Sequence, residues 1–250
     1  MLQLVRIELY KLRKKNILYI LFICNLLPVL YGLGAKFEWS FIQISTKLDW
    51  INFATTMWTL TFIFAIPLIM FMYLGASMIG GEKYNGQIML AVTRVADRSK
   101  LISGKFLALS LLVLGFYVFN LCVSILSHLL FIRGTQYSQP AVWNEDTLSG
   151  ILTSLGTTAF ILLLCYIVML SSVKYSALIA TVVGLLCYLL SQVLQYIPSI
   201  KKFSPAYFVL TERSDLDDLG LLLCYQIVLY LVLYVLIMRI TKKIFKTIDL

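Results

Sequence analysis

Few residues in this chain could take part in chemistry, and their spacing matches no complete catalytic motif. Residues 81–88 hold two glycines at the separation found in an ATP-binding phosphate loop. Gln87 and Ile88 stand where that loop needs a lysine and a hydroxyl residue, which neutralise the phosphates and bind the metal. The sequence therefore predicts no ATP site in this chain, and any ATP would have to be bound by another subunit.

The chain contains 1 histidine, His128. A paired-histidine zinc motif is therefore impossible, and a Ser-His-Asp arrangement would lack an acid in the surrounding apolar run to orient the imidazole. The 5 cysteines all lie inside apolar runs without the short spacing of metal ligands. We predict no catalytic centre, cofactor or metal, and interpret His128 as a hydrogen-bonded histidine near one end of its span, with a ligand contact as the alternative.

Composition indicates a membrane protein. Of the 250 residues, 60% are apolar and 13% are charged, and the formal net charge is +9. A soluble domain has nearer to ~45–50% apolar and ~25% charged residues. A basic chain often binds nucleic acid, but here the charges lie between long apolar runs. We therefore expect a membrane partner and no nucleic acid.

Six runs without Asp, Glu, Lys or Arg are long enough to cross a bilayer as helices, since a crossing takes about 20 residues. They are 17–35, 53–80, 106–132, 150–173, 175–197 and 219–238. The sequence thus predicts an all-α membrane protein that forms a single transmembrane domain over 1–250. Pro28 and Pro67 fall inside two of the runs and should kink them.

Charge placement predicts the orientation. The side that holds both termini, the 81–105 connection and Lys174 carries fifteen of the 21 basic residues. Cytoplasmic loops carry the excess of Lys and Arg, so we expect both termini to be cytoplasmic in a multi-pass plasma-membrane protein.

Two elements on the basic side have helical patterns. In the first fifteen residues the apolar side chains recur at helical spacing: Leu2, Val5, Leu9 and Leu12. This pattern favours an interfacial helix whose basic face meets anionic headgroups, with a plain extension of the first span as the alternative.

The second element is the connection 81–105, where a stripe recurs at i, i+4, i+7 and i+11: Tyr84, Ile88, Ala91 and Val95. Basic residues surround it: Lys83, Arg94, Arg98 and Lys100. An amphipathic helix of this kind suits a groove on a partner protein, and a basic loop without a partner is the alternative.

This connection resembles the cytoplasmic signature of ABC-2 type permeases, which begins E-x3-G-T and continues with a leucine, a proline and an arginine, with G-K opening the third span. The matching residues are Glu82, Gly86, Leu90, Arg98, Gly104 and Lys105. Two residues depart from the signature: Gln87 stands where threonine is usual, and Val95 stands where proline is usual. The order of an N-terminal helix, six spans and a signature between the second and third spans is also similar to that family.

The resemblance implies the transmembrane subunit of an ABC transporter. A second permease chain, identical or sister, and ABC ATPase subunits carrying ATP and Mg²⁺ would complete the assembly. The connection would be the coupling helix, and its ATPase-docking residues would be Glu82, Tyr84, Gly86, Gln87, Ile88, Leu90, Arg94 and Arg98.

Short outer loops and a Lys-rich start resemble permeases of bacterial lantibiotic and bacteriocin immunity systems, which export antimicrobial peptides. A cationic peptide would suit tyrosines in the spans and acids at the outer mouth. The substrate-path candidates are Tyr117, His128, Tyr166, Tyr188, Asp215 and Asp217. The alternatives are helix packing for the tyrosines, topology-setting loop charge for the acids, and a drug, lipid or polysaccharide as substrate. Two other functions are the alternatives to transport: a non-transporting sensor or scaffold and, more remotely, an intramembrane enzyme.

Overall fold

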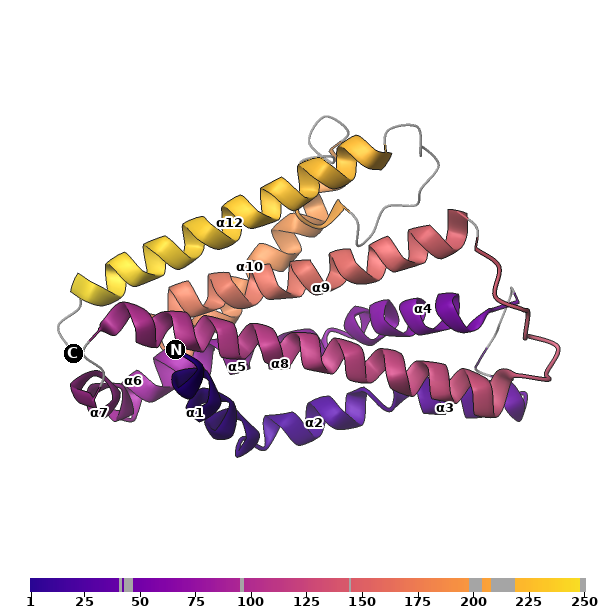
Figure 1. Ribbon diagram of the computed structural model, residues 1–250, viewed down its shortest axis with the longest axis horizontal. Coiled ribbons are helices and arrows are strands. Elements are labelled where there is room, and N and C mark those ends of the chain that lie inside the picture. The colour runs from indigo at the N-terminus through magenta and orange to yellow at the C-terminus, as the bar shows by residue number, and fades with distance from the viewer. Residues whose placement is uncertain are drawn as a thin grey trace.

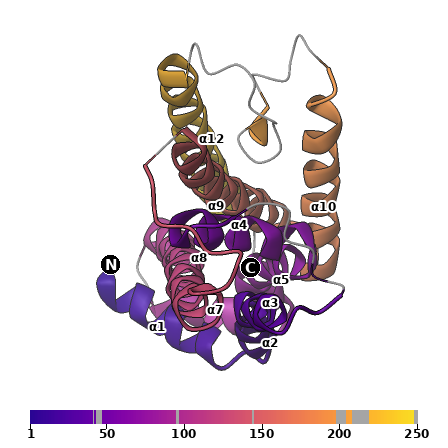
Figure 2. The same cartoon turned by 90° about the vertical axis from the view of Figure 1, so that its right-hand side faces the viewer.

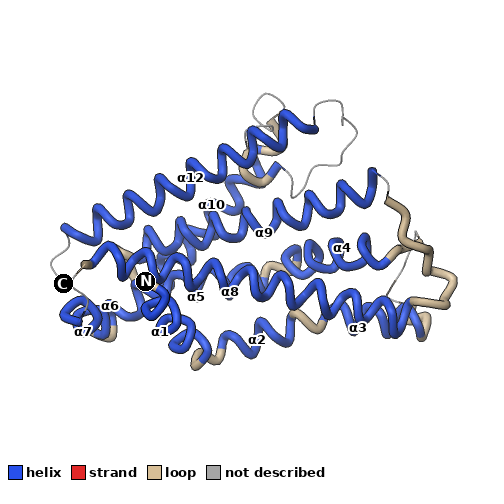
Figure 3. The backbone as a smooth tube through the Cα atoms, viewed as in Figure 1, coloured by secondary structure: helices blue, strands red, loops and turns tan. Residues whose placement is uncertain are grey.

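The computed structural model describes residues 1–40, 42, 47–94, 97–143, 145–197, 204–207 and 219–247. The chain is helical over most of these ranges (Figures 1 and 3). The elements are α1 (Leu2–Arg13), α2 (Ile17–Cys24), α3 (Leu27–Lys36), α4 (Trp50–Ile63), α5 (Ile66–Ala76), the π-helix η1 (Ser77–Gly81), α6 (Glu82–Tyr84), α7 (Gln87–Arg94), α8 (Arg98–Ser127), the π-helix η2 (His128–Ile132), α9 (Glu145–Ser172), α10 (Ala177–Leu194) and α12 (Leu219–Thr247).

Five of the described helical segments are long and apolar enough to cross a membrane: Ile17–Lys36, Arg98–Ile132, Thr147–Ser172, Ala177–Leu194 and Leu223–Phe245. α4 and the segment Ile66–Tyr84 are together long and apolar enough for a sixth crossing, although the pair is bent by 69°. This confirms the expected all-α membrane fold. Figure 1 shows α1, α6, α7 and the last turn of α12 at one end of the bundle, which we call the α7 end.

α9 packs at the centre of the bundle, where it contacts α4, α5, α8, α10 and α12. In Figure 2, α10 and α12 lie on two sides of the molecule, with α4, α5 and α8 below them. The indole N–H of the fully buried Trp58 donates to Thr158 Oγ1 at 3.0 Å and ties α4 to α9. Far from the α7 end, the segment 204–207 bridges α10 and α12, because Gln195 Nε2 donates to Ala206 O and Gln226 Nε2 donates to Ser204 O.

Both predicted kinks occur at breaks in the spans. α2 ends at Cys24 and α3 begins at Leu27, with Pro28 in its first turn. α4 and α5 are separated at Phe64 and Ala65, and Pro67 lies in the first turn of α5, where its missing N–H costs no helical hydrogen bond. Ala65 takes the left-handed conformation at φ 58°, which a non-glycine residue adopts only under constraint from its surroundings.

Two elements differ from what the apolar runs alone suggest. The helix that holds the third apolar run begins at Arg98, ahead of residue 106, because the Asp97 side chain accepts from Ser99 N at 2.8 Å and caps α8 there. With 30 residues, α8 is about 45 Å long, which exceeds the ~30 Å hydrocarbon core by several turns. The connection 81–105 is also not one helix: it comprises the end of η1, then α6, α7 and the first two turns of α8.

Candidate functional site

The α7 end brings together three segments that are distant in the sequence. α1 packs on α8, and η1 carries the chain from α5 into α6 beside them. Gly104 permits the close approach of α1, since a Cβ at this position would lie 3.3 Å from Leu4 Cβ. The Val5 and Leu12 side chains of α1 are buried, as its helical stripe predicts, whereas Leu2 is exposed.

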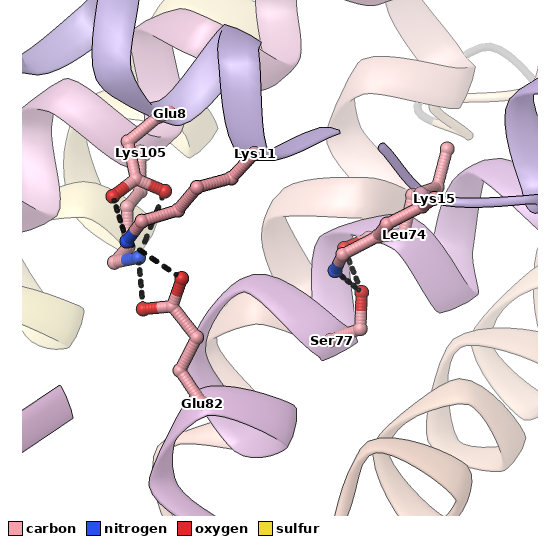
Figure 4. A network of polar contacts seen from close by, with 7 residues as sticks. All are labelled: Glu8, Lys11, Lys15, Leu74, Ser77, Glu82 and Lys105. Carbon is pink, nitrogen blue, oxygen red and sulfur yellow. Dashed lines mark hydrogen bonds and ion pairs between the residues drawn. The ribbon is translucent and has the colours of Figure 1, made fainter. Parts of the chain in front are cut away.

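Four charged side chains meet where these segments converge, and we call them the charge cluster: Glu8, Lys11, Glu82 and Lys105 (Figure 4). Lys105 Nζ lies 2.6 Å from Glu82 Oε2 and 2.9 Å from Glu8 Oε2. Lys11 Nζ lies 3.0 Å from Glu82 Oε1 and 3.1 Å from Glu8 Oε1. Each lysine therefore bridges both carboxylates, and the cluster joins α1, α6 and α8.

The charge cluster is neutral, and three of its four members are buried, whereas the Lys11 side chain is 38% exposed. Lys105 is 0% exposed, and Glu8 and Glu82 are 3% and 7% exposed. Buried charges are tolerated when they are paired and hydrogen-bonded, and here every carboxylate oxygen has an ammonium partner. Burial lowers the pKa of Lys11, but the attraction of Glu8 and Glu82 outweighs it, so the pKa is raised from its usual value and Lys11 stays charged.

Removal of one member would leave an uncompensated buried charge, which costs about 3–5 kcal/mol. The three helices are therefore held as one body at this point.

The predicted docking residues divide into two groups. Tyr84 is 89% and Leu90 is 63% exposed, and Gly86 and Gln87 are exposed as well. Glu82 and Ile88 are buried, so their side chains do not face outward as predicted.

The predicted stripe is broken between Tyr84 and Ile88, which lie on different helices. Gly86 takes φ 70° between α6 and α7, a left-handed turn that glycine adopts without strain and that ends the helical register. Arg98 lies in the first turn of α8. Arg94 ends α7, but its side chain is not described, and Val95 lies outside the described residues.

Two of the substrate-path tyrosines form hydrogen bonds inside the bundle. The Tyr117 hydroxyl lies 3.1 Å from Ser154 Oγ, and the Tyr166 hydroxyl lies 2.8 Å from Ser110 Oγ. Both contacts join α8 to α9. The two side chains therefore take part in helix packing, the alternative weighed for them.

The other substrate-path candidates lie apart from these two. His128 is buried in η2, with Nε2 at 3.1 Å from Leu48 O, as expected for a hydrogen-bonded histidine. Tyr188 borders a small apolar cavity at the α4–α5 bend, together with Thr59, Phe62, Ile63, Leu68, Thr157, Phe160 and Ile161. Asp215 and Asp217 lie outside the described residues.

Sequence comparison decides the family. The family described as ABC-2 family transporter protein matches residues 4–192, a stretch that includes all four residues of the charge cluster. The chain belongs to the ABC-2 transporter family. No curated protein matches it. As an ABC-2 permease, the chain is the transmembrane subunit of an ABC transporter, and such subunits work with an ABC ATPase subunit.

The sequence did not predict the ion pairs that join Glu8 and Glu82 to Lys11 and Lys105 in the charge cluster. Glu82 and Lys105 of this ABC-2 permease both belong to the sequence pattern that resembles the permease signature, but their spacing does not show that they touch. The sequence predicts no role for Glu8, although it is the one acid among five basic residues in the first fifteen positions. The signal that could have identified Glu8 is its position as an isolated acid in a basic amphipathic helix.

Proposed function

We propose that this ABC-2 permease is a conduit driven by ATP hydrolysis in a separate subunit, which docks on α6 and α7. The observation that supports docking is the exposure of Tyr84, Met89 and Leu90 on a short segment at the α7 end. Exposed apolar side chains among basic residues are typical of a surface that binds a groove on another protein. The buried Glu82 and Ile88 anchor the segment to the bundle, while the exposed residues contact the ATPase.

The charge cluster transmits the movement. Closure of the ATPase subunits around ATP displaces α6 and α7, and Glu82 carries that displacement to Lys105 on α8 and to Glu8 and Lys11 on α1. ATP can drive the spans only if the ATP-bound subunits favour one arrangement of these helices over the other. The 69° break between α4 and α5 gives this span a place to bend as that arrangement changes.

The α7 end faces the cytoplasm of a bacterial cell in this proposal, and a second permease chain completes the transmembrane path. The support is the excess of basic residues on this side of the spans. The shared position of α1 and the end of α12 agrees with an even number of crossings.

The proposed substrate is a cationic antimicrobial peptide, expelled as part of an immunity system. Its support is the resemblance to immunity permeases and the acidic sequence 212–218 ahead of the last apolar run. Cells that lack the chain should become sensitive to cationic lantibiotics and not to small hydrophobic drugs. Unchanged peptide sensitivity would instead favour export of a drug, lipid or polysaccharide.

Co-purification tests the proposed subunit. The tagged full chain, extracted from its own cells in mild detergent, should bring down an ABC ATPase, and the complex should hydrolyse ATP whereas the chain alone should not. Recovery of the chain without any ATPase would favour the sensor or scaffold function.

A further inference from the structure

A second polar site lies beside the charge cluster, at the turn between α1 and α2. An open hollow of about 620 Å³, open solvent included, is lined by Lys14, Lys15, Asn16, Ile17, Tyr73 and Ser77. The lining contains two ammonium groups, an amide and two hydroxyls, and no carboxylate. Figure 4 shows Lys15 directed towards Ser77 and separate from the cluster.

The Lys15 ammonium is bonded to a hydroxyl group and not to a carboxylate of the described residues. Its Nζ donates to Ser77 Oγ at 2.5 Å, and Ser77 Oγ in turn donates to Leu74 O at 2.8 Å. None of the ion pairs found among the described residues includes Lys15. The ammonium therefore has donors left for a ligand in the hollow.

The surroundings of Lys15 disfavour its charge in the absence of a ligand. Its pKa is lowered chiefly because burial disfavours the ammonium form. The attraction of Glu82 and Glu8 is opposed by repulsion from Lys105 and Lys11, since the cluster is neutral as a whole. An anion in the hollow would supply the missing counter-charge.

We infer that this hollow binds the phosphate of an anionic phospholipid headgroup. Lys15 and Lys14 would hold the phosphate by charge-assisted hydrogen bonds, and Asn16 and the Tyr73 hydroxyl would contact the rest of the headgroup. This goes beyond a general attraction of a basic helix to the membrane, because it assigns one lipid to one set of side chains.

Depth in the membrane favours a lipid over free phosphate. The lysines immediately precede Ile17, the first residue of the first candidate span, so we expect the hollow to lie at the level of the headgroups. Ile17 is part of the lining, and Ile20, one turn further along α2, is exposed. An acyl chain attached to the bound headgroup would lie along these apolar side chains.

Native mass spectrometry of the purified full chain, equilibrated with phosphatidylglycerol and phosphatidylcholine, tests the site. The wild type should retain one phosphatidylglycerol in preference to phosphatidylcholine, and excess inorganic phosphate should not displace it. Lys15→Gln should weaken retention about fivefold, the effect of one lysine near an anionic surface. Lys15→Arg keeps the charge and should retain the lipid.

Lys36→Gln is the matched control, since it removes the same charge from the exposed far end of the first span and should leave retention unchanged. If Lys15→Gln does not fold, Lys14→Gln gives the second test, because Lys14 is exposed and also lines the hollow. Equal retention of both lipids by the wild type, equal loss in Lys36→Gln, or displacement by inorganic phosphate would overturn the inference. Binding is measured without an ATPase, so either outcome leaves the proposed function untouched.

Discussion

Lys105→Met is expected to lower the free energy of unfolding by about 3–5 kcal/mol. The side chain is fully buried between Glu8 and Glu82, so its removal leaves one negative charge in the cluster without a partner. Methionine has a similar length and keeps the packing of the side chain, which isolates the loss of charge. Thermal unfolding of the full chain in detergent measures the change as a lowered Tm.

A matched control and a double variant make this prediction specific to the cluster. Lys100→Met removes the same charge from an exposed position on α8 and should change stability by no more than about 0.5 kcal/mol. Glu8→Gln combined with Lys105→Met leaves the pair of Lys11 and Glu82, which is neutral. The double variant should therefore lose less stability than the sum of the two single losses. Additive losses would contradict a shared cluster.

Leu90→Asp is expected to weaken association with the ATPase subunit by about tenfold or more, without lowering the Tm of the chain. Leu90 is 63% exposed on α7, so the carboxylate stays in water before docking and would be buried unpaired after it. The measurement is the fraction of ATPase recovered with the tagged chain, together with ATP hydrolysis by the complex.

Trp143→Asp is the control for this variant, because Trp143 is 71% exposed in the connection between η2 and α9, and Figure 1 shows this connection at the opposite end of the bundle from α7. It should leave ATPase recovery unchanged. Equal loss in both variants, or no loss in Leu90→Asp, would show that α7 is not the docking element. Glu82 is a poor choice for this test, since its substitution would also break the charge cluster.

Apolar run length was enough to predict the fold but not the residue at which the helix of the third apolar run begins. A search for runs without charge stops at Lys105, whereas α8 continues back to Arg98. Lys105 lies inside a packed helix because Glu8 and Glu82 neutralise it. An apolar run in the sequence does not show which distant residues form ion pairs. A helix end whose charges are neutralised by such pairs is therefore left out of the predicted helix.

The candidate site was only partly predictable, again because contacts between distant residues are not visible in the local sequence. The resemblance to the permease signature identified Glu82 and Lys105 as candidates. Helical periodicity predicted that Val5 and Leu12 lie on the apolar face of α1, and both are buried. The stripe through Tyr84 and Ile88 failed because the left-handed turn at Gly86 interrupts the helix between them. Glu8 was missed because its role depends on how α1 packs on α8, which no spacing along the chain reveals.

The central claim is that another subunit drives this ABC-2 permease through α6 and α7. Photo-crosslinking in living cells tests it most directly, with the photoreactive residue p-benzoylphenylalanine replacing Leu90 in one variant and Trp143 in another. The Leu90 variant should form an adduct in which mass spectrometry finds peptides of an ABC ATPase, and the Trp143 variant should not. Adducts with lipid alone at position 90, together with ATP hydrolysis by the purified chain unaided, would contradict the claim.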